Sequence, residues 1–316
     1  MSVWRQLSAV AVDGPTAVTV GNFDGVHRGH QVVLASTLQA ARHRGGLPVV
    51  AVTFNPHPVS VLVPGRAPSA LTDVDRRAEL LGSVGVDHVL VLAFDLAVAA
   101  WSPAEFVHRV LVDALHAGVV VVGADFRFGA RAAGDVAALR TQGARLGFAV
   151  EAVELATGAH NEPWSSSAVR SALARGDVGA AARVLGRDHA VRGVVVVGDR
   201  RGRQLGYPTA NVPAAARAAV PADGVYAGTL RRLDDGGADA LPAAISVGTN
   251  PTFDGASRRI EAYVLGRDDL DLYGVPVEIA FRRHLRAQVR FDDVDRLVDQ
   301  MARDVDDTRA AFADVD

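Results

Sequence analysis

The sequence predicts an α/β domain with a parallel sheet, followed by an antiparallel β-barrel or β-sandwich domain that ends in a helix. Residues 17–153 alternate short apolar strands with amphipathic helices, which is the pattern of a parallel sheet covered by helices on both faces. Residues 190–285 instead hold short β-rich segments divided by Gly, Pro and Asp turns, which favours an antiparallel barrel or sandwich. We place the boundary near Gly186, so that the predicted domains are 1–185 and 186–316.

In the first domain, strands and helices follow one another in strict order. The predicted strands are short and apolar, at 17–20, 48–54, 88–94, 118–123 and 148–155. The predicted helices lie between them, at 28–44, 71–85, 102–116 and 134–147, with a further helical stretch at 165–185. Thr72 or Asp73 can cap the second helix, and Ser102 followed by Pro103 is a helix start. Ligands of such sheets bind at the carboxyl ends of the strands.

In the second domain, the predicted strands follow one another without helices between them, and a helix is predicted after the last strand. The β-rich segments are 190–198, 224–233, 241–248, 258–266 and 276–285, and the alanine-rich segment 213–222 is predicted to be a loop. From Asp292 onward, Leu297, Met301, Val305 and Thr308 recur at three- and four-residue spacing, which predicts an amphipathic helix.

Composition excludes several classes of function. The 316 residues carry a net charge of -3 and no cysteine, so disulfides, thiolate catalysis and cysteine-ligated zinc are excluded, and we expect no nucleic-acid partner. No lysine occurs, although a Walker A loop and the protein-kinase signature both require one. We find no signal-peptide pattern and no apolar run of membrane-spanning length, and we therefore expect a cytoplasmic protein without a membrane partner.

The segment GNFDGVHRGH (21–30) lies where the first strand gives way to a helix. Its glycines allow a sharp turn and close approach to a ligand, and the free N–H groups of the following helix form an anion site. His27 and His30 add donors at the same place, which suits a phosphate chain with a departing pyrophosphate. Ordinary helix-start histidines and a metal pair are alternatives, but metal histidines usually lie at i, i+4 or have a third ligand nearby.

Three other stretches carry candidate chemistry. SSSAVR (165–170) offers a serine cap and Arg170, which together can clamp a phosphate or form a plain cap with a solvated arginine. In GRQLGYPTANV (202–212), Thr209 and Asn211 present oxygens on one side of an extended chain, as a Mg²⁺–ATP site could use; the alternative is a polar turn. Glu261, inside a strand-like run, is either solvated or functional.

GNFDGVHRGH resembles the signature of the HxGH nucleotidyltransferases, which implies a Rossmann-like first domain. With TFNPHPVSVL (53–62), VGADFRFGARAAGD (122–135) and SSSAVR, it resembles the amino-terminal module of the prokaryotic bifunctional riboflavin kinase/FAD synthetases. The segments PTAN, DGVYAG, AISVGTNPTF, a strand glutamate and DLYG occur in the order typical of riboflavin kinases. Two departures are Trp164 before the serines, where the family has I-S-S-T-x-x-R, and VLGRDDLDLYG, where the family has an acidic-aromatic stretch.

The resemblance implies two reactions, in which ATP phosphorylates riboflavin to FMN and a second ATP adenylates FMN to FAD with release of pyrophosphate. It implies that Glu261 is the base for the ribityl hydroxyl, and that Thr209 and Asn211 serve Mg²⁺–ATP. The FMN phosphate is already an anion and needs donors rather than a base, which the resemblance assigns to His27, His30, Ser167 and Arg170. No covalent enzyme intermediate is implied.

Further positions match the family's binding motifs. They are Gly21, Asn22, Phe23, Asp24, Gly29, Phe54, Asn55, Pro56, His57, Asp125 and Phe128 in the first domain, with Phe126 as a further candidate near the flavin, and Gly202, Gly206, Pro208, Tyr226 and Asn250 in the second. We expect a monomer or weak homo-oligomer whose partners are ATP, riboflavin and FMN. The alternatives are a non-catalytic flavin- or nucleotide-binding regulator on the same fold, and a transferase with one activity and another acceptor.

Overall fold

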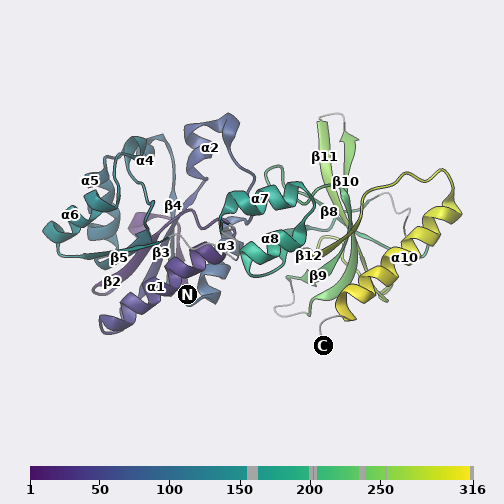
Figure 1. The fold of residues 1–316 in the computed structure, drawn as a ribbon, viewed down its shortest axis with the longest axis horizontal. Coiled ribbons are helices and arrows are strands. Elements are labelled where there is room, and N and C mark those ends of the chain that lie inside the picture. The colour runs from purple at the N-terminus through teal and green to yellow at the C-terminus, as the bar shows by residue number, and fades with distance from the viewer. Residues whose placement is uncertain (155–162, 199–201, 203–204, 235–238, 253–254, 314–316) are drawn as a thin grey trace. The chain divides into compact units, whose positions relative to one another are not determined.

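The computed structural model describes residues 1–154, 163–198, 202, 205–234, 239–252 and 255–313, which fall into two compact units (Figure 1). The first unit comprises 1–68 and 73–165, and the second comprises 69–72 and 166–316. The second unit thus includes the helical stretch before Gly186 that we assigned to the first domain. The short piece 69–72 joins it because the Ala219 N–H donates to the Ala70 carbonyl (2.8 Å), an anchor in the predicted alanine-rich loop.

The first unit is built on a parallel six-stranded sheet in the order β1-β4-β3-β2-β5-β6. The strands are β1 (Ser2–Trp4), β2 (Thr16–Val20), β3 (Val49–Asn55), β4 (His88–Ala93), β5 (Ala117–Gly123) and β6 (Ala149–Val153). Five of them are the predicted strands. The three-residue β1 was not predicted, because it is too short to show a period and forms only by pairing with β4.

Helices cover both faces of this sheet (Figure 1). On one face, α1 (Arg28–His43) and α3 (Val74–Ser83) contribute Leu34 and Leu81 to a core with β2 and β3. On the other face lie α5 (Pro103–Phe106), the π-helix η3 (Val107–Ala114) and α6 (Val136–Leu146). The predicted helix starts are present, with Ser102 and Glu105 forming a capping box and Asp73, not Thr72, capping α3. Short turns of helix complete the unit: η1 (Leu7–Ala9), α2 (Pro58–Leu62), η2 (Pro64–Arg66), α4 (Leu96–Ala99) and η4 (Ala130–Ala132).

The second unit is an antiparallel, nearly closed barrel in the order β7-β12-β9-β10-β11-β8. Its strands are β7 (His189–Val194), β8 (Ala210–Pro213), β9 (Gly224–Arg232), β10 (Leu241–Thr252), β11 (Gly255–Val264) and β12 (Pro276–Arg286). The chain after β7 turns back onto β8, where the Val196 N–H donates to the Asn211 carbonyl (2.8 Å), so the two edges approach closure. Tyr226 and Phe281 are fully buried inside.

In the part of the second unit that the structure describes, α7, α8 and α10 accompany the barrel. The helices α7 (Ser166–Ala174) and α8 (Val178–Leu185) pack on each other, and α8 contacts β7 and β12. The closing helix α10 (Val294–Ala313) packs against β9, β10 and β12. Of its predicted apolar face, Val305 and Thr308 are buried and Leu297 and Met301 half-buried. The predicted fold class is therefore confirmed.

Candidate active sites

The loop between β2 and α1 has the shape that its glycines predicted, but it also strains two other residues. Gly25 has a φ of 84°, while Phe23 and Val26 have φ of 47° and 40°. Residues that carry a side chain rarely adopt this left-handed region of φ, and such backbone strain persists only where the surrounding structure imposes it. His27 follows as the cap of α1, its Nδ1 accepting a hydrogen bond from the His30 N–H (3.3 Å).

The two histidines lie directly against each other. Their rings are stacked with centroids 3.6 Å apart, and Phe23 meets the His30 ring edge-on at 5.2 Å. Burial, followed by the nearby His27 and Arg77, lowers the pKa of His30 well below its ordinary value of 6.5. Among the described residues, the buried Nδ1 of His30 has no hydrogen-bond partner. His30 is thus held uncharged beside the start of α1, where backbone N–H groups can receive a negatively charged ligand.

Gly29 separates the histidines because no larger residue fits. A Cβ at this position would lie 2.6 Å from the Trp164 carbonyl oxygen and 3.2 Å from the His27 ring. The Arg28 guanidinium lies over the Trp164 ring, 5.9 Å from its centroid. Trp164, a departure from the family pattern, thus packs against the signature loop.

A large aromatic cavity opens beside this loop. Its volume is about 840 Å³, within the range of small-molecule sites. The predicted residues Gly21, Asn22, Phe54 and Phe128 line it together with Phe126. Sequence reasoning missed the other main contributors, which come from separate segments: Phe94, Trp101, Phe106, Arg127 and Arg131. Phe126 stacks on Phe128 at 5.4 Å, and Phe54 meets Phe94 edge-on at 5.7 Å.

Other predicted residues of the first unit lie outside that lining. Phe23 and Asp24 are buried within the loop (2% exposed each). The cis peptide bond Asn55–Pro56 precedes His57, whose Nδ1 accepts from the Val59 N–H (3.2 Å) and caps α2. Asp125 lines a separate cavity of about 650 Å³ beside the start of α6. Direct ligand contact by these residues stays a prediction.

Ser167 and Arg170 belong to the second unit. Ser167 is exposed in the first turn of α7, and the half-buried Arg170 donates from Nε to the Ser69 carbonyl (2.7 Å). Their predicted convergence with the histidines therefore stays a prediction.

In the second unit, the half-buried Glu261 lines a cavity and has a cross-strand neighbour. It lies on β11 directly opposite Asn211 of β8, and paired residues share a face of the sheet. Asn211 donates from Nδ2 to the Thr209 hydroxyl (3.4 Å) and carbonyl (3.3 Å). Thr209 borders two cavities, a small one of about 50 Å³ that Asn211 and Pro208 also line, and one of about 270 Å³ that Glu261 and Gly202 line. The structure thus brings the predicted kinase residues together.

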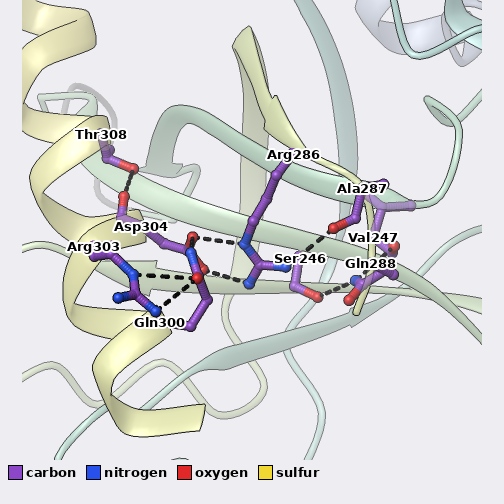
Figure 2. Close-up of polar contacts among 9 residues, drawn as sticks. All are labelled: Ser246, Val247, Arg286, Ala287, Gln288, Gln300, Arg303, Asp304 and Thr308. Carbon is purple, nitrogen blue, oxygen red and sulfur yellow. Dashed lines mark hydrogen bonds and ion pairs between the residues drawn. The ribbon is translucent and has the colours of Figure 1, made fainter. Parts of the chain in front are cut away.

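The larger of these cavities has a wall made by α10. Leu297, Met301 and Val305 give apolar surface there. Figure 2 shows the polar side of this wall, where both carboxylate oxygens of Asp304 accept from the Arg286 guanidinium (2.8 and 2.7 Å). Gln300 adds a hydrogen bond to the same carboxylate (2.9 Å). Sequence reasoning missed this pair, although a carboxylate on an apolar helix face was a usable signal.

Three further residues of the second unit, Tyr226, Gly206 and Asn250, were predicted to bind ligands. Tyr226 is fully buried, its hydroxyl donates to the Ala222 carbonyl (2.6 Å), and it lines neither cavity of the barrel. Burial raises its pKa to about 12. Gly206 has a φ of 83° in the loop before Pro208. The side chain of Asn250 lies outside the described residues.

The comparisons with known proteins match both units. The FAD synthetase family model matches residues 10–168, and the riboflavin kinase model matches residues 185–312. The chain is 38% identical to the bifunctional riboflavin kinase/FMN adenylyltransferase of Escherichia coli K12 over 91% of its own length and 90% of the relative's. The chain belongs to this family.

Other relatives agree across nearly the whole chain. The bifunctional riboflavin kinase/FMN adenylyltransferase of Pseudomonas fluorescens is 39% identical over 93% of this chain and 92% of its own. A crystal structure described as a macrolide-efflux protein from Streptococcus pneumoniae has a TM-score of 0.86 and 32% identity, covering 97% of this chain and 98% of that one. No described helix here is long and apolar enough to cross a membrane. The predicted family and its two enzyme activities are therefore confirmed.

Proposed function

We propose that the cavity beside α10 is the site of riboflavin phosphorylation, and that the aromatic cavity beside the histidine loop is the site of FMN adenylylation. The observation that carries this assignment is that each unit holds a cavity bordered by its own predicted residues: Glu261 and Thr209 in one, Gly21 and Phe54 in the other. The family matches divide in the same way between the two activities.

In the kinase step, the nucleophile is a hydroxyl and needs a proton acceptor. The Glu261 carboxylate would accept that proton as the oxygen attacks the γ-phosphoryl group of ATP. Thr209 borders the same cavity as Glu261, so phosphate held at Thr209 can meet a hydroxyl held at Glu261. The apolar residues of α10 would cover the flavin ring.

The residues present fit a Mg²⁺ ion that arrives with ATP. The Thr209 hydroxyl and the side-chain carbonyl of Asn211 are neutral oxygen ligands on neighbouring side chains, and the Asn211 amide nitrogen donates to the Thr209 hydroxyl (3.4 Å). Thr209 and Asn211 would therefore hold the ion, with phosphate and water as its other ligands. Bound there, Mg²⁺ would spread the charge of the transferring phosphoryl group.

In the adenylyl step, the FMN phosphate attacks the α-phosphorus of ATP and pyrophosphate leaves. The N-terminus of α1, His27 and His30 would stabilise the negative charge that moves onto pyrophosphate, and we propose Ser167 and Arg170 as a second clamp. Phe54, Phe126 and Phe128 would stack on the isoalloxazine ring. Arg127 and Arg131 line the same cavity and could bind the FMN phosphate.

Product chromatography after mixing the protein with riboflavin, ATP and Mg²⁺ tests both assignments at once. His30→Ala should stop at FMN, and Glu261→Gln should leave riboflavin unchanged while still converting added FMN to FAD. Equal loss of both activities in a folded variant would contradict the assignment of one reaction to each unit. If the wild-type chain formed neither FMN nor FAD, the alternative of a non-catalytic flavin- or nucleotide-binding regulator would be favoured.

Three coarser properties belong to the same proposal. We propose domains 1–185 and 186–316, supported by family matches that end at residue 168 and begin at residue 185. Because both reactions consume ATP, we propose a cytoplasmic location. A monomer or weak homo-oligomer is proposed because each cavity is lined by one unit of a single chain, and light scattering with and without substrates would measure this.

A further inference from the structure

Arg77 is a buried cation in the first unit that the sequence motifs do not include. It lies on α3 and is 5% exposed. Because arginine is almost never buried without partners, its contacts show what it holds in place. Its Nη1 donates to the Thr53 hydroxyl and to the Phe54 carbonyl, both at 3.1 Å. Its Nη2 lies 3.9 Å from the Asp24 carboxylate, which is itself buried.

These partners come from the two strand ends that form the site. Thr53 and Phe54 lie near the carboxyl end of β3, and Phe54 lines the aromatic cavity. Asp24 belongs to the signature loop after β2, and the Thr53 hydroxyl ties itself to that loop by donating to the Asn22 carbonyl (2.9 Å). The Arg77 guanidinium therefore contacts both the loop, at Asp24, and the cavity wall, at Thr53 and Phe54.

The loop needs such support because its backbone is strained. Phe23 and Val26, on either side of Asp24 and Gly25, have left-handed φ values, which are strained for residues that carry a side chain. A buried ion pair is a poor source of stability, since a packed apolar pair of similar volume is often as stable. The pair is useful here because a planar guanidinium holds several partners in a fixed geometry at once.

We propose that Arg77 is a positioning residue for FMN adenylylation, holding the loop 21–30 in the shape that aligns the histidines with the phosphates. It does not touch the substrate in this role. The inference rests on the proposed assignment of the adenylyl step to this unit. The Arg77 charge also acts on His30: burial, His27 and then Arg77 lower the pKa of His30, while Asp24 faces Arg77 from the loop.

The test compares Arg77→Met, Arg77→Lys and Thr53→Val with Arg76→Met in the full-length protein. Arg76 is the neighbour on α3 and pairs on the surface with Glu79 (3.0 Å), so its variant should keep wild-type rates. Arg77→Met should lower kcat for FMN adenylylation at least thirtyfold, with KM for ATP changed less than threefold. Arg77→Lys should recover part of that loss, and Thr53→Val should lower kcat about tenfold.

Two measurements separate positioning from a loss of folding. Riboflavin phosphorylation by the same chains should be unchanged, and in Arg77→Met the pKa of His30, followed by NMR of its ring protons, should rise. If Arg77→Met fails to fold, Arg77→Lys and Thr53→Val decide. Folded variants with wild-type adenylylation kcat would overturn the proposal for Arg77, whereas normal FAD formation by His30→Ala would overturn the assignment of the site.

Discussion

Replacing Asp304 by Asn should loosen α10 and weaken riboflavin binding. The carboxylate, 5% exposed, accepts two hydrogen bonds from Arg286 and one from Gln300. An amide has only one oxygen and would turn an N–H₂ group toward the guanidinium. The variant therefore keeps the shape of the side chain but leaves the cation without its counter-charge.

The expected magnitude follows from this geometry. Breaking a buried ion pair by removing one partner costs about 3–5 kcal/mol. The Arg286 side chain stays 22% exposed and keeps a hydrogen bond from Nη1 to the Ala287 carbonyl (3.0 Å), so we expect about 2–3 kcal/mol in the free energy of unfolding of the second unit. Riboflavin binding responds only to the part of this loss that displaces the α10 wall of the cavity. A loss of about 1.4 kcal/mol in binding free energy is a tenfold change in affinity, and we expect KM for riboflavin to rise about tenfold.

The assay is urea unfolding followed by circular dichroism, together with the kinetics of both reactions. Asp306→Asn is the matched control, because Asp306 lies on the same helix and pairs with Arg309 in solvent; it should behave as wild type. FMN adenylylation by Asp304→Asn should be unchanged. Wild-type stability and wild-type KM for riboflavin in Asp304→Asn would refute the reasoning.

The remaining predictions concern single features of each unit. Gly29→Ala should reduce FAD formation at least tenfold because its Cβ would meet the Trp164 carbonyl at 2.6 Å, whereas Gly179→Ala, whose nearest contact is 3.7 Å, should not; a wild-type rate in Gly29→Ala would count against the packed loop. Tyr226→Phe should cost about 1 kcal/mol in unfolding free energy at pH 7 through its lost hydrogen bond. Burial raises the pKa of Tyr226 in the folded protein to about 12, so its contribution to the free energy of unfolding is complete below its ordinary value of 10.0 and is lost as pH rises through 12. Between pH 8 and pH 11, urea unfolding should therefore show a smaller loss of stability in Tyr226→Phe than in wild type. A changed KM for riboflavin in this variant would instead indicate that Tyr226 contacts the ligand. Burial holds the pKa of His30 well below its ordinary value in the free protein. The negative charge of bound ATP should raise that pKa, so ATP binding should take up more protons as the pH is lowered. Calorimetry in buffers of different ionisation enthalpy would detect this uptake in wild type and find it reduced in His30→Ala.

The sequence predicted the elements whose period is local. The apolar strands at 17–20 and 118–123 could only be buried in a covered sheet, and the spacing of Leu297, Met301, Val305 and Thr308 made α10 amphipathic wherever it packed. GNFDGVHRGH fixed a turn and a helix start because glycine, a capping side chain and free N–H groups act within ten residues. The motif order also identified the family and its two activities.

Tertiary structure decided whatever depends on partners far apart in the chain. The sequence marks Glu261 as a charged residue in a strand, but only its pairing with Asn211 and the approach of α10 place it in a cavity. Arg77 shares a helix face with Ala78 and Leu81, and only the fold brings it under Thr53 and Asp24. The sequence by itself therefore determined the chemistry available and the local shape of each motif. Which charges are buried, which pKa values shift and which residues share a cavity were decided by folding, because desolvation and charge pairing arise only when distant segments exclude water together.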